Sequence, residues 1–334
     1  MTLFDDDIPK LAEEPAETPA TTSEPSESTP NPVSAGSPAG DPFWNPAPVV
    51  VPYAQRPEVP EDLRISWSWV HLIGFLSFAV ISLIVVQTGF AIHYAPHQQL
   101  PQKELEQYLF SIPQFIVGSN VAWFAIVMIF LYVSLAVLPN VPFWRTLGWR
   151  KFSSTPGAMH SGLPTKPWVY LAAGCGLSLL AAVVGSRVHA PEDMPIEQLL
   201  KSRAGSMLMM SMAVLVAPLV EETIFRGYLY PALVRMISGV LRFLGVEMGQ
   251  SIRSGITYSI VGTGLLFGLL HGAQLAWTWG IVTLLIFVGI TFTYVRAKTG
   301  TVFASYLMHL GYNGLIAVAT ILGTHGFTKM PPHP

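Results

Sequence analysis

Residues 207 to 233 read MLMMSMAVLVAPLVEETIFRGYLYPAL, and the segment EETIFRG occupies positions 221–227. This segment places two carboxylates and a guanidinium, those of Glu221, Glu222 and Arg226, inside an otherwise apolar stretch. An ionised side chain at bilayer depth costs at least ~2.5 kcal/mol. The three charges therefore indicate either a site built inside a membrane or a stretch that is not in a membrane.

The composition favours the membrane. The chain has 334 residues, of which 51% are hydrophobic and 11% are charged, and its mean hydropathy is +0.47. A soluble domain has about 25% charged residues. The formal net charge is -2 and no basic patch is present, so nucleic acid is not an expected partner. The single cysteine, Cys175, cannot form an internal disulfide.

Residues 1–64 form a distinct segment, rich in Pro, Ser, Thr and Glu, which we expect to be disordered because it cannot bury enough apolar surface. Seven apolar segments follow, at Trp69–Ile92, Pro113–Leu138, Pro167–Ser186, Ser206–Ile237, Ile256–His271, Trp277–Val295 and Val302–Leu322. Only helices and closed barrels satisfy all backbone groups in lipid. The predicted fold is therefore all-α, a polytopic membrane bundle of about seven transmembrane helices.

Within this bundle we expect two N-terminal transmembrane helices in residues 65–150 and a functional core in 167–323. The fourth apolar segment is too long for one perpendicular span and contains Pro218 and Pro231, so a kink near Pro218, or a span followed by an interfacial helix, is expected. In the fifth segment, Gly264 and Gly268 form a small-residue face that lets another helix approach closely.

Lysine and arginine residues between the segments predict the orientation. The loops expected to be cytoplasmic contain Arg145, Arg150, Lys151, Lys166, Arg235, Arg242, Arg253, Arg296 and Lys298. The positive-inside rule then places the N-terminus in the cytoplasm and the C-terminus outside. The loop with Arg187, Lys201 and Arg203 runs against this pattern, because it would lie outside.

Three polar constellations stand out within the apolar segments, and the first is Glu221, Glu222 and Arg226. On a helix, Glu222 and Arg226 are i, i+4 neighbours that can pair, whereas Glu221 is rotated by ~100° from Glu222. One carboxylate can therefore be neutralised by the arginine while the other points elsewhere. This separation suits one structural and one reactive carboxylate.

Two more groups lie on later segments. Phe267 and His271 share one helical face, and so do His309 and Asn313. Histidine and asparagine side chains can donate hydrogen bonds to a developing oxyanion. Each residue alone could simply bond a neighbouring helix, but the three groups together, on separate segments, point to a shared site.

The three groups, in this order and spacing, resemble the motifs of the CAAX protease and bacteriocin-processing family of intramembrane glutamic endopeptidases. They read Glu221-Glu222-x-x-x-Arg226, Phe267-x-x-x-His271 and His309-x-x-x-Asn313. The string EETIFRGYLY is similar to the family's first motif. The resemblance extends over residues 167–322.

The resemblance implies a helical bundle with a conical cavity that reaches the catalytic residues, and a reaction that needs no cofactor and no metal. Glu221 would be the general base that activates a water shared with His271. His309 and Asn313 would stabilise the oxyanion. Glu222, Arg226 and Phe267 would support the site. The expected partners are a peptide or membrane-protein substrate and the lipid bilayer.

Other interpretations remain open. Two histidines and a glutamate could form the zinc shell of a metallopeptidase, although no His-Glu-x-x-His is present. A membrane scaffold or a bacteriocin-immunity-type protein could bind peptides without cleaving them. A transporter is a further alternative, but no inverted repeat is evident. We expect the protein in a bacterial inner membrane, and the residues do not rank its possible substrates.

Overall fold

The structure is a computed structural model that describes residues 59–152, 164–188 and 202–328. The chain divides into two units, Met1–Arg56 and Pro57–Pro334, and all described residues belong to the second. The expected disordered tail lies outside the described residues up to position 58. In the described ranges all regular structure is helical, which confirms the predicted all-α class.

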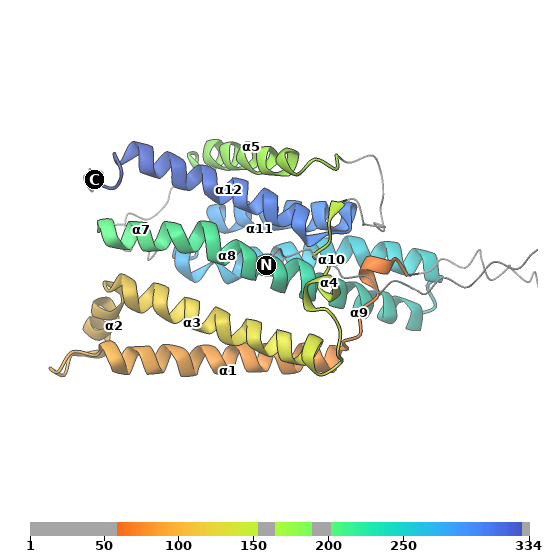
Figure 1. The fold of residues 1–334 in the computed structure, drawn as a ribbon, viewed down its shortest axis with the longest axis horizontal. Helices are drawn as coiled ribbons and strands as arrows, with labels where there is room; N and C mark the ends of the chain where they lie inside the picture. The colour runs from red at the N-terminus through yellow and green to blue at the C-terminus, as the bar shows by residue number, and fades with distance from the viewer. Residues whose placement is uncertain (1–58, 153–163, 189–201, 329–334) are drawn as a thin grey trace, which may run out of the picture. The chain divides into compact units, whose positions relative to one another are not determined.

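The main helices run in the order shown in Figure 1. Their bounds are α1 Trp69–Tyr94, α2 Gln102–Phe110, α3 Pro113–Tyr132, α4 Phe143–Thr146, α5 Pro167–Gly185, α7 Arg203–Ser211, α8 Ala217–Glu222, α9 Tyr230–Phe243, α10 Met248–Leu270, α11 Trp279–Thr299 and α12 Val302–Gly323. Short 3-10 segments lie at Glu61–Leu63 and Ala273–Leu275, and π-helical turns lie at Val133–Val137, Met212–Val216 and Thr223–Leu229.

Six helical spans of the described residues are long and apolar enough to cross a membrane. They are Trp69–Tyr94, Pro113–Val137, Pro167–Gly185, Arg203–Phe243, Trp279–Thr299 and Val302–Gly323. The protein is thus an integral membrane protein, as its composition predicts. The remaining expected segment, Ile256–His271, corresponds to α10, which is helical but not among the six.

The long fourth segment is one helical run that passes both prolines. Proline lacks an N–H, and its ring clashes with the carbonyl four residues earlier. The π turn Met212–Val216 precedes Pro218, and the π turn Thr223–Leu229 precedes Pro231. Such a turn inserts one extra residue into the helix. The expected disturbance near Pro218 therefore takes the form of a wider turn, and the run continues to Phe243.

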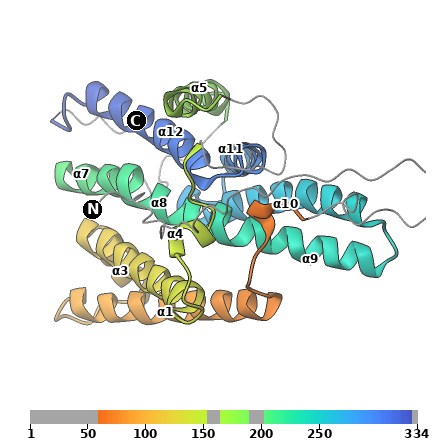
Figure 2. The ribbon, with the colours of Figure 1, turned by 45° about the vertical axis from the view of Figure 1, so that its right-hand side comes forward.

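Glycines allow two pairs of helices to pack closely. A Cβ on Gly264 or Gly268 of α10 would collide with Ile290 or Ile286 of α11, which confirms the expected small-residue face. A Cβ on Gly174 of α5 would likewise collide with the backbone of α12 at Met308. Figures 1 and 2 both show α5 beside α12. These close contacts bring α10, α11 and α12 to the region where the charged segment lies.

An aromatic cluster fixes the position of the second π turn. Tyr228 is fully buried, its ring stacks on Trp67 with 5.4 Å between centroids, and its hydroxyl lies 2.7 Å from Nδ1 of His71. Phe75 of α1 packs edge-on against the same tyrosine. The π turn that contains Arg226 is thereby anchored to the N-terminal helix.

The residues just before α1 are folded rather than part of a tail. Leu63 is 3% exposed, and Asp62 forms a buried ion pair with Arg296 of α11. Glu61 pairs with Arg150, and Arg235 of α9 donates to the carbonyls of Ile65 and Trp67. We call residues 59–67 the N-terminal strap. The expected tail boundary at 64 falls inside this folded strap. Two ion pairs, Glu61–Arg150 and Asp62–Arg296, join the strap to residues far away in the sequence.

Candidate active site

The charged segment separates its two carboxylates, as the helical spacing predicts. Glu221 and Glu222 are the last residues of α8, and Arg226 lies in the following π turn. Glu222 Oε1 lies 2.9 Å from Arg226 Nη1, and both side chains are 0% exposed. The side chain of Glu221 is 16% exposed. Glu222 is therefore the paired carboxylate, and Glu221 is the more accessible one.

Arg226 is bound on every side. Its Nε donates to Thr293 Oγ1 at 3.2 Å and its Nη2 donates to Gly289 O at 2.9 Å, both on α11. Its Cζ lies 4.6 Å from the centroid of the Phe267 ring and 5.4 Å from that of Phe292. Hydrogen bonds and cation–π contacts together offset the desolvation of this charge.

His309 of α12 lies between the two carboxylates. Its Nδ1 is 3.0 Å from Glu222 Oε1, and its Nε2 is 3.9 Å from Glu221 Oε2. The ring is also 4.8 Å from that of Phe292. Because a carboxylate only accepts hydrogen bonds, Nδ1 carries a hydrogen in this contact. Glu222 thus orients the histidine and directs Nε2 towards Glu221.

His271 caps the C-terminal end of α10. Its Nδ1 lies 2.8 Å from the carbonyl oxygen of Phe267, so Nδ1 is the protonated nitrogen of this bond. In the neutral ring, Nε2 then has a free lone pair that can accept a proton. The Phe267 ring lies 4.8 Å from His271 and 5.9 Å from His309, between the two histidines.

Asn313 is held by a different contact from the one expected. Its Nδ2 donates to the carbonyl of Ala213 at 2.7 Å. In the π turn the N–H of Ala217 bonds Met212 O, and Pro218 has no N–H to continue this pattern to Ala213 O. Asn313 therefore satisfies a carbonyl that the proline leaves without a donor. The second N–H of the amide is not used in this bond.

The structure thus brings five of the predicted site residues into one contact cluster and joins the other two to it indirectly. Glu221, Glu222, Arg226, Phe267 and His309 form the cluster. His271 joins through Phe267. Asn313 lies on the same helix as His309 and joins by its bond to Ala213, in the helical run that contains the two glutamates.

Three residues of α11 were missed by sequence reasoning: Gly289, Phe292 and Thr293. Thr293 Oγ1 donates to Gly289 O, four residues earlier, at 2.8 Å and also accepts from Arg226. A threonine in an apolar helix routinely bonds the carbonyl four residues earlier. Its second role therefore has no distinguishing signal in the sequence.

In the part of the chain that the structure describes, no group of three or more His, Cys, Asp and Glu side chains is arranged to hold a metal ion. The cavity with a volume of about 480 Å³ is lined by residues of the strap, α9 and α10, and none of the predicted site residues lines it. The expected conical cavity at the glutamates stays a prediction.

The fold and the site define a class: a polytopic helical membrane protein with a buried carboxylate–arginine–histidine cluster. Residues 203–315, from α7 into α12, match the family model described as Rce1-like, type II CAAX prenyl endopeptidase Rce1-like. Over these residues the chain is similar to that family, as the three motifs predict. No curated protein and no solved structure matches the chain. The family match supports an intramembrane protease.

Proposed function

We propose that the protein is an intramembrane endopeptidase that hydrolyses a peptide bond near the C-terminus of lipidated or membrane-associated substrates, using water activated by Glu221. The observation that carries this proposal is the unequal pairing of the two carboxylates. Glu222 is fully buried between Arg226 and His309, whereas Glu221 keeps partial exposure and lies 3.9 Å from His309 Nε2.

That separation is too long for a direct hydrogen bond and leaves room for a water bound to Glu221 beside His309 Nε2. Glu221 takes a proton from this water while its oxygen attacks the substrate carbonyl carbon. His271, through the lone pair of Nε2, shares the water. The carbonyl oxygen becomes an oxyanion, and the C–N bond then breaks as the proton held by Glu221 passes to the leaving amine nitrogen.

The oxyanion is stabilised by His309 and Asn313. When the His309 ring carries hydrogens on both nitrogens, Nδ1–H bonds Glu222 and Nε2–H can donate to the oxyanion. Asn313 offers the amide hydrogen that is not bonded to Ala213. Glu222, Arg226 and Phe267 hold this arrangement in place. The core at 167–323 is the proposed peptidase unit, since the family match lies within it.

We place the protein in a bacterial inner membrane with its N-terminus in the cytoplasm. Arg64, Arg150 and Arg235 each donate a hydrogen bond to a residue of the strap, which precedes α1. A concentration of arginines beside the first span is typical of a cytoplasmic end.

The direct test compares purified full-length wild type with Glu221→Gln in liposomes. The probes are a C-terminally farnesylated peptide and the same peptide without the lipid, with products read by mass spectrometry. We expect Glu221→Gln to lower the cleavage rate by about 10²–10⁴-fold, the usual contribution of a general base. The control is Glu104→Gln, the same change on the exposed face of α2.

Cleavage by Glu221→Gln at the wild-type rate would overturn the proposed role of Glu221. Loss of cleavage on chelation, with one equivalent of zinc in the purified protein, would favour the metallopeptidase. Binding of the peptides without cleavage by folded wild type would favour the scaffold. Faster cleavage of the farnesylated peptide would identify the substrate as lipidated.

A further inference from the structure

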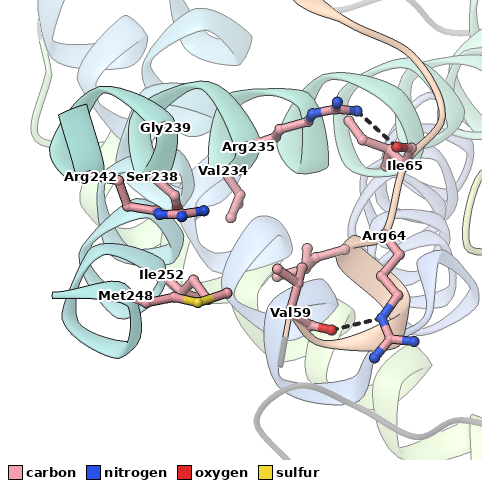
Figure 3. Close-up of a pocket in the computed structure, with 11 residues that line it drawn as sticks. Val59, Arg64, Ile65, Val234, Arg235, Ser238, Gly239, Arg242, Met248 and Ile252 are labelled. Atoms are coloured by element: carbon pink, nitrogen blue, oxygen red, sulfur yellow. Dashed lines mark hydrogen bonds between the residues drawn. The ribbon is translucent and has the colours of Figure 1, made fainter. Parts of the chain in front are cut away.

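A cavity of about 480 Å³ lies away from the candidate active site, between the N-terminal strap, α9 and the start of α10. Figure 3 shows the side chains that line it. No sequence motif pointed to this cavity, and the proposed peptidase chemistry does not use it. Its lining combines apolar side chains with arginines, and this combination indicates which class of ligand would fit.

The inner wall is apolar. Leu63 and Val234 are each 3% exposed and Ile252 is 8% exposed. Val59 and Met248 complete this surface. When a hydrocarbon chain covers such a wall, the apolar area removed from water stabilises the complex by about 25 cal/mol per Å².

The rim is cationic. Arg235 and Arg242 lie seven residues apart on α9, about two turns, and therefore share a face. Arg64 of the strap adds a third guanidinium. The described residues that line the cavity include no Asp or Glu. Arg64 and Arg235 also donate to backbone carbonyls of the strap. Guanidinium groups bind phosphate oxygens in a bidentate manner.

The surroundings are those of a membrane surface. α9 is the end of the span Arg203–Phe243, and Val240 and Phe243, which directly follow the lining residues Gly239 and Arg242 in sequence, are 59% and 90% exposed. Apolar side chains exposed at the end of a membrane span are suited to the boundary between headgroups and acyl chains. Hydrocarbon and the headgroup region are therefore both within reach of this cavity.

We propose that this cavity binds one anionic glycerophospholipid, with its phosphate on the arginine rim and the start of an acyl chain against the apolar wall. The volume lies in the range that holds a small-molecule ligand. A zwitterionic choline headgroup fits less well because its cation would face three guanidinium groups. An inorganic phosphate would leave the apolar wall uncovered.

A substitution at Gly239 tests most directly whether a lipid binds in the cavity. Gly239 lines the cavity, and a Cβ built on it meets no atom within 4 Å. Gly239→Leu therefore adds an apolar side chain at the cavity lining, at a position where its Cβ has room, and it also raises the helix propensity of α9. Its matched control is Gly89→Leu on α1, where a Cβ likewise meets nothing within 4 Å.

The experiment titrates the full-length protein in detergent with dioleoylphosphatidylglycerol, dioleoylphosphatidylcholine or inorganic phosphate, and reads bound lipid by native mass spectrometry. We expect one saturable site that prefers phosphatidylglycerol. Arg242→Gln should weaken its Kd about fivefold, the usual effect of one arginine near an anionic surface. Gly239→Leu should weaken it by more than Arg242→Gln.

The controls Gly89→Leu and Arg253→Gln, the latter removing an exposed arginine of α10 outside the cavity, should bind phosphatidylglycerol like wild type. Equal binding of the two lipids would overturn the proposal, as would equal weakening by Arg253→Gln. Competition by inorganic phosphate at the same concentration as lipid would show a free-anion site instead. Unchanged binding by Gly239→Leu would place the lipid elsewhere.

Discussion

The described part of the chain contains two buried arginine–carboxylate pairs of nearly identical geometry. Arg226 meets Glu222 at 2.9 Å with both side chains 0% exposed, and Arg296 meets Asp62 at 2.9 Å with both 1% exposed. In each pair one carboxylate oxygen has no hydrogen-bond partner among the described residues, Oε2 of Glu222 and Oδ1 of Asp62. An ion pair by itself therefore does not mark the active site.

Their neighbours separate the two pairs. Glu222 also contacts His309, and Arg226 donates from Nε, Nη1 and Nη2. Arg296 bonds only Asp62 atoms in the described contacts, and its Nε is without a partner there. The first pair positions a histidine beside a second carboxylate. The second pair ties the strap to α11, and we interpret its role as architectural.

The largest expected effect comes from breaking the first pair. Arg226→Met leaves the Glu222 carboxylate buried without its cation, which costs about 3–5 kcal/mol. It also releases the orientation of His309, so we expect cleavage to fall to background. Unfolding in detergent and cleavage of a farnesylated peptide measure the two effects. A folded Arg226→Met protein with wild-type cleavage would remove the distinction between the pairs.

The matched change in the second pair is Arg296→Met. It leaves the Asp62 carboxylate buried without its cation and should also lower the free energy of unfolding by about 3–5 kcal/mol. The folded fraction should cleave at the wild-type rate, because the hydrogen bonds and the ring contact described for Arg296 go to Asp62 and Tyr230, neither of which is a predicted site residue. Cleavage per folded molecule, obtained from activity and unfolding on the same sample, checks this. A loss equal to that of Arg226→Met would assign Arg296 to the site.

A smaller effect is expected at the edge of the first pair's site. Asn313→Leu removes the donor to the part-buried carbonyl of Ala213, and a carbonyl left without a partner away from water costs about 1–3 kcal/mol. The thermal unfolding midpoint of the purified protein would measure this loss. An unchanged midpoint would show that another group satisfies Ala213, and the amide would then act only on the oxyanion.

The smallest effect is expected at an exposed carboxylate outside both pairs. Glu247 caps α10, and hydrogen bonds from the backbone N–H groups of Gly249 and Gln250 lower its pKa from the ordinary 4.5. A lowered pKa contributes stability above the unfolded pKa and loses it as pH falls through the folded one. Glu247→Gln should therefore be less stable than wild type at neutral pH, with the gap closing below about pH 4. A gap that is constant with pH would contradict this role.

The two pairs also show what the sequence can predict. Glu222 and Arg226 are four residues apart in an apolar run, so both their pairing and the different direction of Glu221 follow from helical geometry. Asp62 and Arg296 are 234 positions apart. In the sequence, Asp62 falls in the segment expected to be a disordered tail, and Arg296 falls in an expected loop. Only the tertiary fold brings the two residues together.

The same contrast holds along the rest of the chain. Apolar runs predict the spans because their length is set by the bilayer. The π turn before Pro218 and the bond from Asn313 to Ala213 were not predicted. A π turn adds one residue to the helix, and in a run that is apolar on all sides this addition leaves no visible change in the sequence pattern. Thr293 was missed because its local bond is normal for a helix.

The most direct test of the account removes each pair completely. A buried ion pair replaced by apolar residues of similar size is often neutral for stability, so Glu222→Leu with Arg226→Met and Asp62→Leu with Arg296→Met should both fold. The rate of peptide cleavage by the two double variants in the same liposomes is the measurement. The account predicts a loss of about 10²-fold or more in the cleavage rate for Glu222→Leu with Arg226→Met. It predicts a rate close to wild type for Asp62→Leu with Arg296→Met. Equal rates for the two double variants would contradict it.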